Sequence, residues 1–291
     1  MKSKLKILVV EPTNLCNFRC PQCPYSPGRV THLRLNRYES LVGQGSGLGV
    51  EVVRLLGLGE PTLHPHFDRL LSIARQYRIR SHVLTNGSFV LDHSRIQLML
   101  AAPPDELEFS IDASSATTFQ AVRGKDELYF DRLTKGIRRF LHEIDRARTR
   151  LVVSFVAHEN SLGELGDFRR QWNGYVDEVR VRAPHNFNGT LARSHVFDPL
   201  LSVGPQPRAC MFWQDRIAMA STGSVSICNL DQTGTLLLAG AGEPLDLEHL
   251  WYRGKRREFI RKIEEGVDGG VCADCTKCSA LVWPQAAHTG S

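Results

Sequence analysis

Short apolar segments alternate with longer amphipathic segments over the first 182 residues of the chain. Apolar runs of about four to eight residues are typical of buried strands, and apolar residues three or four positions apart are typical of helices. Six such strand–helix units, each about 30 residues long, predict a parallel α/β fold. Such a fold is either a doubly wound sheet or a partial barrel.

The predicted strands span about residues 5–10, 50–56, 81–85, 106–111, 150–157 and 178–182. The predicted helices span about residues 36–42, 66–77, 94–102, 129–143 and 162–172. We expect the first of these helices to be weak and to end at a glycine-rich run, residues 43–49. In parallel α/β folds the loops that follow the strands meet at one edge and carry the chemistry. We therefore expect functional residues directly after each strand.

The loop after the first strand contains three cysteines, Cys16, Cys20 and Cys23, at C-x₃-C-x₂-C spacing. The proline and asparagine residues between them suit an irregular loop, in which three thiolates can converge on one metal centre. A structural zinc site has four ligands, whereas an iron–sulfur cluster with three ligands keeps one iron open. A zinc knuckle and three unrelated thiols are the alternatives, but His32 lies too far along the loop to be an obvious fourth ligand.

This motif resembles, in spacing and position, the signature of the radical S-adenosylmethionine (SAM) enzymes. The resemblance implies that Cys16, Cys20 and Cys23 hold a [4Fe–4S] cluster whose open iron chelates SAM through its amino and carboxylate groups. It also implies one-electron cleavage of SAM to methionine and a 5′-deoxyadenosyl radical. Gln22 departs from the family pattern, which has an aromatic or other apolar residue before the last cysteine. That departure affects the expected packing against adenine and leaves the ligation unchanged.

The loop after the second strand reads Gly59-Glu60-Pro61. It is similar to the family's G-G-E-P loop, which binds the SAM amino group, and matches three of its four positions, with Leu58 in place of the first glycine. Glycine allows a close backbone approach, and a carboxylate can accept hydrogen bonds from an ammonium group. A turn with a chance glutamate is the alternative.

The third and fourth strands are also followed by short polar residues. The resemblance implies that Thr85, Asn86, Ser110 and Asp112 lie near the SAM ribose and that Arg123 lies near its carboxylate. From the residues alone, Asn86 could belong to an ordinary N-G turn and Asp112 could cap a helix. An arginine such as Arg123 more often faces solvent.

The bulk composition is that of an ordinary globular protein. The net charge is +5 at pH 7, a small excess that does not indicate nucleic acid. No apolar run approaches the roughly 20 residues of a membrane helix. The few apolar residues before Glu11 are too short for the core of a signal peptide. We therefore expect a cytoplasmic protein that binds neither a membrane nor nucleic acid.

The eight cysteines fall into two groups, and cytoplasmic thiols clustered in this way indicate metal sites rather than disulfides. The second group comprises Cys210, Cys228, Cys272, Cys275 and Cys278. Cys210 and Cys228 flank a predicted hairpin, residues 216–228, and a basic helix over residues 256–265 precedes the others.

A cysteine, a hairpin with G-x₄-C, a helix and then C-x₂-C resemble the twitch domain, the short form of the SPASM domain of radical SAM enzymes. The resemblance implies a second [4Fe–4S] cluster with Cys210, Cys228, Cys272 and Cys275 as ligands. Structural zinc is the alternative, because four cysteines suit either metal. The expected architecture is a partial (β/α)₆ TIM barrel at residues 1–190, a linker at 191–209 and a small α/β twitch domain at 210–291.

One thiol of the second group is left over, most simply Cys278, although Cys275 and Cys278 could instead be the ligating pair. Related twitch epimerases use such a cysteine to return hydrogen to a sugar radical, whereas dehydrogenases pass an electron to the auxiliary cluster and form a ketone. We therefore expect hydrogen abstraction from a carbinol carbon of a sugar or aminocyclitol, as in antibiotic biosynthesis, with epimerisation favoured. An inert thiol at Cys278 is the alternative.

Dehydrogenation and peptide modification remain open as functions. Peptide-modifying relatives often begin with a peptide-binding extension, whereas the first strand here starts at about residue 5. The resemblance implies an electron donor such as flavodoxin or ferredoxin. A zinc-binding module without catalytic activity is the alternative of a different class.

Overall fold

The computed structural model describes residues 4–25, 28–182, 184, 187, 212–231, 234 and 236–265, without the side chains of 212–213 and 262–265. Within these residues nine strands form one sheet with the order β6-β5-β4-β3-β2-β1-β7-β8-β9. The strands are β1 (Ile7–Val10), β2 (Val52–Leu55), β3 (Arg80–Thr85), β4 (Glu106–Ser110), β5 (Arg150–Val156), β6 (Glu178–Arg182), β7 (Arg216–Met219), β8 (Val225–Ser226) and β9 (Leu237–Ala239).

The helices and 3₁₀ turns alternate with these strands. The α-helices are α1 (Leu35–Gly47), α2 (Phe67–Gln76), α3 (His93–Ala101), α4 (Ala116–Arg123), α5 (Glu127–Glu143), α6 (Leu165–Trp172), α7 (Phe212–Asp215), α8 (Leu247–Tyr252) and α9 (Gly254–Glu265). The 3₁₀ turns are η1 (Pro61–Leu63), η2 (Ser88–Leu91) and η3 (Leu162–Glu164).

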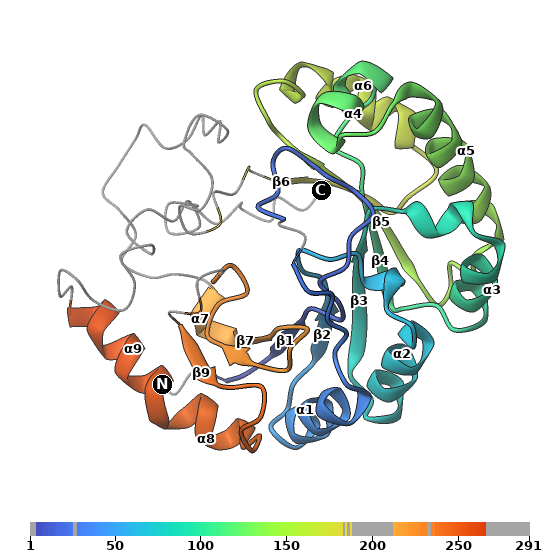
Figure 1. Ribbon diagram of the computed structural model, residues 1–291. Helices are drawn as coiled ribbons and strands as arrows, with labels where there is room; N and C mark the ends of the chain where they lie inside the picture. Colours follow the sequence, from blue (N-terminus) through green and yellow to red (C-terminus); the bar gives the residue numbers. More distant parts are fainter. Residues whose placement is uncertain are drawn as a thin grey trace.

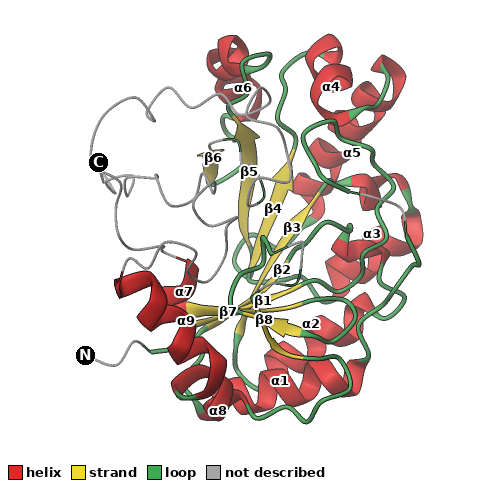
Figure 2. Ribbon diagram, turned by 60° about the vertical axis from the view of Figure 1, so that its left-hand side comes forward, coloured by secondary structure: helices red, strands yellow, loops and turns green. Residues whose placement is uncertain are grey.

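Strands β1 to β6 pair with their sequence neighbours in parallel, and the sheet curves. Helices α1 to α6 lie on its convex side (Figure 1). Figure 2 shows the same strands side by side, with the helices along one face. This is the partial (β/α)₆ TIM barrel predicted from the alternation, and the six predicted strands are confirmed within a few residues.

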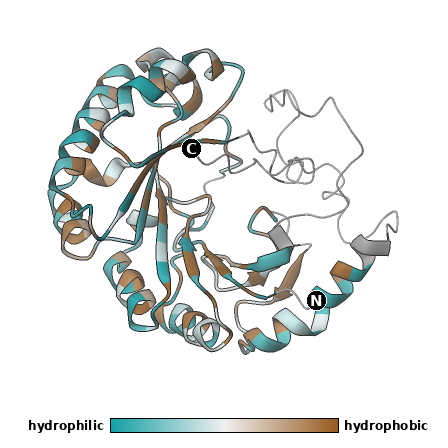
Figure 3. Cartoon of the chain, turned by 180° about the vertical axis from the view of Figure 1, so that it is seen from behind, coloured by the Kyte–Doolittle hydropathy of each residue, from teal (hydrophilic) through white to brown (hydrophobic). Residues whose placement is uncertain are grey.

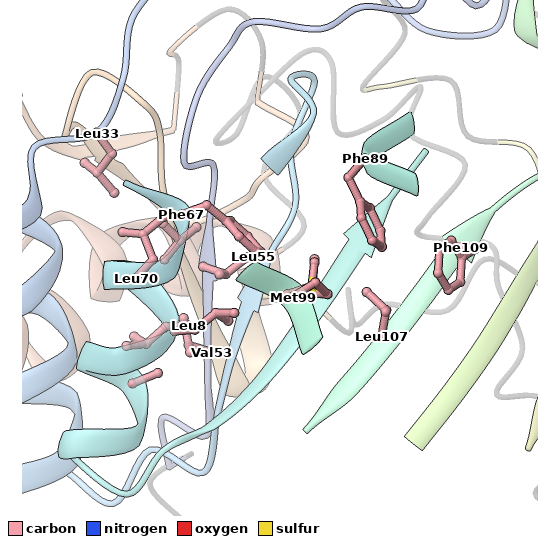
Figure 4. Close-up of a cluster of buried hydrophobic side chains, with 14 of the residues drawn as sticks. Leu8, Leu33, Val53, Leu55, Phe67, Leu70, Phe89, Met99, Leu107 and Phe109 are labelled. Carbon is pink, nitrogen blue, oxygen red and sulfur yellow. The ribbon is translucent and has the colours of Figure 1, made fainter. Parts of the chain in front are cut away.

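The main core lies between the sheet and the outer helices. Figure 3 shows hydrophobic and hydrophilic residues alternating along those helices, as expected when one side of each helix is buried. In Figure 4, Val53 and Leu55 of β2 lie close to Phe67 and Leu70, and Leu107 of β4 points towards the helical layer. Because successive side chains of a strand point to opposite faces, the residues between these core positions line the inner, concave face of the sheet.

The C-terminal segment continues the same sheet. Strand β7 pairs in parallel with β1, and β7 pairs antiparallel with β8 through the turn at residues 220–224. The predicted hairpin is therefore confirmed. Its tip also contacts the start of the cysteine loop, because Ser221 donates hydrogen bonds from its N–H and Oγ to Glu11 Oε2, at 3.2 and 2.9 Å.

The first predicted helix is longer than the sequence indicated. We expected the glycine-rich run at 43–49 to end it, but α1 continues to Gly47. A Cβ atom on Gly45 would lie 3.0 Å from the Leu8 side chain and 3.3 Å from that of Val50. The glycines therefore allow the helix to pack closely against the sheet instead of ending it.

Helix α4 was not predicted, because its two threonines and single aromatic residue give a weak helical pattern. Its N-terminus is fixed by the Glu164 carboxylate, which accepts hydrogen bonds from N–H and Oγ of both Ser114 and Ser115 and from Oγ1 of Thr118. The Ser115 hydroxyl in turn accepts a hydrogen bond from the Thr118 N–H at 3.2 Å. Burial opposes ionisation of Glu164, but these hydrogen bonds outweigh it and lower its pKa to about 2.

Substituting Glu164→Gln removes a charged cap from α4, and we expect the free energy of unfolding to fall by about 1 kcal/mol at neutral pH. Since the folded-state pKa lies below the ordinary value of 4.5, the stabilisation is complete above pH 4.5 and disappears as the pH falls towards 2. Urea unfolding of both proteins over this pH range measures the difference. A difference that does not change with pH would contradict the assignment.

Candidate active site

The three cysteines of the first motif lie in the loop that follows β1 at the carboxyl edge of the barrel. The loop is anchored by Phe18, which is 1% exposed and packs edge-on against Phe119 of α4 and Tyr129 of α5. Arg19 closes the loop by donating from Nη1 to the Cys16 carbonyl at 2.8 Å. The aromatic anchor was not among the predicted site residues, although a phenylalanine between two candidate metal ligands is a recognisable signal.

The thiols of Cys16, Cys20 and Cys23 lie close enough to affect one another. Burial, together with the neighbouring Cys20 and Cys16, raises the pKa of Cys23 to about 11. Burial likewise raises the pKa of Cys20. Because thiolates are the metal-binding form, a bound metal centre would displace these protons.

The separation of the thiols bears on the zinc alternative. One zinc ion with Zn–S bonds of about 2.3 Å needs its sulfur atoms within about 4.6 Å of one another. Among the described residues, however, the only three metal-binding side chains whose ligand atoms lie within 4.8 Å are those of His82, Glu106 and Glu108. In this arrangement the three thiols are therefore too far apart to surround a single ion. No disulfide joins the described cysteines.

The loop after β2 runs directly against the cysteine loop. A Cβ atom on Gly59 would lie 1.9 Å from the Thr13 carbonyl oxygen, and the Glu60 N–H donates to the Leu15 carbonyl at 2.8 Å. Gly59 is thus needed for the contact between the two loops. Pro61 begins η1 directly after Glu60.

Glu60 is only 2% exposed and lies at the centre of this arrangement. Its Oε1 accepts hydrogen bonds from Thr62 and from Oγ1 of Thr85, the latter at 2.6 Å, and its Oε2 accepts one from the Asn86 N–H at 2.7 Å. Burial nevertheless raises the pKa of Glu60. A positively charged partner at Oε2, which retains acceptor capacity, would stabilise the ionised form.

The two polar residues predicted at the end of the third strand have different surroundings. Thr85 is 1% exposed and its hydroxyl is committed to Glu60, so it orients that carboxylate. Asn86 faces the cysteine loop: its Nδ2 donates to Asn17 Oδ1 at 2.9 Å and lies 4.0 Å from Cys16 Sγ. Asn86 is thus the residue of this pair that lies beside the thiols.

Asp112 links three parts of the site. It is fully buried with a φ of +65°, a conformation that aspartate tolerates better than most residues. Its Oδ1 accepts from the Val156 N–H, and its Oδ2 accepts from Arg123, Ser110 and Gln22 at 3.0, 3.3 and 3.3 Å. Ser115 rather than Asp112 caps α4. Gln22, the departure from the family pattern, therefore contacts the residue that holds Arg123.

Arg123 is buried, 8% exposed, and stacks over the Phe18 ring. Burial alone would lower its pKa, but the neighbouring Cys20 and Asp112 outweigh it and raise the pKa. Its Nε–H has no hydrogen-bond partner in the described part of the chain. A buried donor without a partner is costly, so Arg123 fits a site that receives an anionic group such as a carboxylate.

Below this edge, the inner face of the barrel contains a charged network that was not predicted. Glu108 is fully buried and accepts hydrogen bonds from Arg180 and Arg182, and the shortest bond from each arginine is 2.6 Å long. His82 Nε2 lies 3.1 Å from Glu108 Oε2. Arg180 also pairs with Glu106 at 2.9 Å. Alternation of charged residues within strands, as in Glu106-x-Glu108 and Arg180-x-Arg182, was the signal available in the sequence.

Most of the second cysteine group lies outside the described residues. This applies to Cys210, Cys272, Cys275 and Cys278 and to the predicted linker at 191–209. Cys228 is described: it follows β8 and is partly buried, and its Sγ accepts a hydrogen bond from the Leu230 N–H at 3.4 Å. The predicted basic helix is confirmed as α9.

The barrel thus brings the cysteine loop and the polar residues around it together at one edge, where they could hold a metal cluster and a small cosubstrate. Residues 10–165 match the Radical SAM superfamily, and the chain belongs to this superfamily. Membership implies an iron–sulfur cluster and SAM. In the described part of the chain, no helix combines the length and apolar composition needed to cross a bilayer.

Similar curated sequences are GTP 3′,8-cyclases. The protein of Synechococcus elongatus is 34% identical over 127 residues, which are 42% of this chain and 38% of that one. The protein of Klebsiella pneumoniae subsp. pneumoniae is 30% identical over 133 residues, or 43% and 40% of the two chains. The matched segment thus spans less than half of either relative.

Similar solved structures extend over almost all of this chain. SuiB of Streptococcus suis bound to its precursor peptide SuiA has a TM-score of 0.73 at 16% identity and covers 96% of this chain and 70% of its own. BtrN in complex with AdoMet and 2-DOIA has a TM-score of 0.64 at 18% identity, over 96% and 94% of the two chains. At these identities the likeness is one of fold.

Proposed function

We propose that this chain uses a SAM-derived radical to remove a hydrogen atom from a carbinol carbon of a small polar substrate, a sugar or aminocyclitol. The observation that carries this proposal is the convergence of the cysteine loop, Glu60, Asn86 and Arg123 at the carboxyl edge of the barrel. A polar inner face below that edge supports a polar substrate.

Cys16, Cys20 and Cys23 would hold the cluster, which supplies the electron for SAM cleavage when it is bound. Glu60 would accept hydrogen bonds from the SAM ammonium group, for which its Oε2 has remaining capacity. Arg123 would receive the carboxylate at its unpaired Nε–H, held in place by Asp112. Asn86 and Ser110 would meet the ribose, and Thr85 would orient Glu60.

We further propose a twitch domain at residues 210–291 with a second cluster on Cys210, Cys228, Cys272 and Cys275. The position of Cys228 supports this assignment, because it ends a hairpin that is joined to β1 through β7 and to Glu11 through Ser221. Cys278 would then be free to return a hydrogen atom to the opposite face of the substrate radical, giving an epimer, and one electron from the reductant and one proton would restore its thiol. The physiological reductant would be a small electron-transfer protein of the flavodoxin or ferredoxin class.

Three other outcomes have support of their own. Oxidation of the carbinol to a ketone stays the second candidate, because the resemblance to a twitch domain fits dehydrogenases as well as epimerases; BtrN, which shares the fold over nearly the full length of both chains, was solved with AdoMet and 2-DOIA. The sequence match to GTP 3′,8-cyclases keeps GTP as a substrate to be tested, although the match covers only about 40% of each chain. SuiB, with its precursor peptide, is a reason to test peptides as well.

The test is anaerobic reconstitution with iron and sulfide, followed by reduction with SAM and candidate substrates in D₂O. Epimerisation predicts one solvent deuterium in the product and no net oxidation. Dehydrogenation predicts a ketone without deuterium at that carbon. A product formed only from GTP or from a peptide would contradict the carbinol proposal, and Cys278→Ala should stop epimer formation while SAM cleavage continues.

A further inference from the structure

We infer that Arg54 and Arg182 bind an anionic group of the substrate, a phosphate or a carboxylate, on the inner face of the barrel. This inference rests on the proposed function and deepens it, since it adds one charged group to the small polar substrate. The two arginines lie on β2 and β6, which are not neighbouring strands, yet they are close enough for their charges to repel each other.

The register of the sheet places Arg54 on that face. Arg54 is aligned with Val9 of β1 and His82 of β3, and its strand neighbours Val53 and Leu55 point into the core on the opposite side. It is the last but one residue of β2, directly before the loop that carries Glu60. The Arg54 side chain therefore faces the inside of the barrel, level with His82 of the charged network.

Arg54 has no hydrogen bond or ion pair among the described residues, unlike its neighbours on the inner face. Arg180 pairs with Glu106, Glu108 and Glu178, and Arg216 pairs with Asp215 at 2.7 Å. Arg54 is partly buried among charged residues, and its five N–H donors have no partner in the described part of the chain. These donors are therefore available for a ligand.

Arg182 supplies the second half of the site. Its Nε and Nη2 donate to Glu108, at 3.0 Å and 2.6 Å, while its Nη1 makes no hydrogen bond in the described residues. Its side chain is 37% exposed, so the free nitrogen can reach a ligand. Because Glu108 fixes the guanidinium plane, little side-chain freedom would be lost on binding.

The charge around Arg54 favours an anion. Burial lowers the pKa of Arg54, and the like charges of Arg216 and Arg182 lower it further, whereas Glu108 opposes them. Positive charge thus dominates at this point, and an anion would relieve the repulsion. A cation held by His82, Glu106 and Glu108 fits less well, because Arg180 and Arg182 already neutralise Glu108.

The test is a titration of the anaerobically reconstituted protein with inorganic pyrophosphate and, separately, with malonate, followed by calorimetry. We expect at least one of the two anions to bind, and Arg54→Met to weaken its binding by about tenfold or more. Arg54→Lys, which keeps the charge but not the planar fork, should give an intermediate loss. Arg139→Met, an equal charge change on the exposed surface of α5, should leave binding unchanged.

The two anions show which anionic group the substrate carries. Binding of pyrophosphate alone indicates a phosphorylated substrate, and binding of malonate alone indicates a carboxylated one. Failure of both anions to bind, or equal binding by the Arg54→Met and wild-type proteins, would overturn the inference. Arg54→Met should not lower the melting temperature, because no bond is lost and like-charge repulsion is relieved; a lower value would indicate a structural role. SAM cleavage without substrate is measured in the same samples. If SAM is cleaved but neither anion binds, this inference fails and the proposed function does not; if SAM is not cleaved, the proposed function fails.

Discussion

Cys20→Ala should abolish reductive SAM cleavage and remove one cluster's worth of iron from the reconstituted protein. The Cys20 thiol is largely buried and interacts electrostatically with Arg123, so it is not an ordinary surface thiol. Loss of a residue that only orients a metal ligand typically lowers metal affinity or activity 10- to 100-fold. Loss of the ligand itself should therefore lower the rate of SAM cleavage by more than about 100-fold. Iron and sulfide assays and the yield of 5′-deoxyadenosine measure both effects.

Gln22→Leu is the matched control for this experiment. Gln22 lies between Cys20 and Cys23 in the sequence, but it contributes a 3.3 Å hydrogen bond to Asp112 rather than a thiolate. We expect the Leu variant to keep its iron and most of its SAM cleavage. Full iron content and an unchanged rate in Cys20→Ala would mean that Cys20 is not a ligand.

Gly59→Ala should destabilise the protein by about 4 kcal/mol, at the upper end of single substitutions. The added Cβ would lie 1.9 Å from the Thr13 carbonyl oxygen and 2.7 Å from its carbon, both of them backbone atoms that no rotamer change can move away. The two loops would have to separate, which would also displace Glu60 from the Leu15 carbonyl. Denaturant unfolding measures the loss, and weaker SAM binding should accompany it.

The control is Gly47→Ala at the end of α1. A Cβ atom there would have no neighbour within 4 Å, and Gly47 is exposed and helical. Alanine is the better helix former, so we expect a gain of roughly 0.5 to 1 kcal/mol. If both alanine variants were equally stable, the close contact between the two loops would be disproved.

The alternation of apolar and amphipathic segments was sufficient to predict the partial barrel, because buried parallel strands are marked by their own residues. The boundaries of α1 and the existence of α4 were not predictable in the same way. Gly45 is helical because Leu8 and Val50 pack closely on it, and α4 begins where Glu164, some 50 residues along the chain, caps it. In both cases long-range contacts outweigh a weak local preference.

In the candidate site, too, features marked by the local sequence were predictable, and features that depend on long-range contacts were not. The cysteines, Glu60 and Asn86 were predictable, because they follow strands in a known order. The sequence did not show that Thr85 serves Glu60, or that Asp112 joins Gln22 to Arg123, because these pairs meet only after the loops fold together. Arg54 was missed for a different reason: within an apolar strand, a single charged residue gives no sign of whether it has a partner.

The pairing of β1 with β7 has a consequence for biosynthesis. The two strands are separated by about two hundred residues, so at roughly 5 to 20 residues per second the ribosome makes β7 about 10 to 40 s after β1. During this interval one edge of β1, next to the loop that contains Cys16, Cys20 and Cys23, has no strand beside it. Chaperones that shield the nascent chain would therefore be needed most before the C-terminal hairpin emerges, and we expect slower translation of that region to increase aggregation.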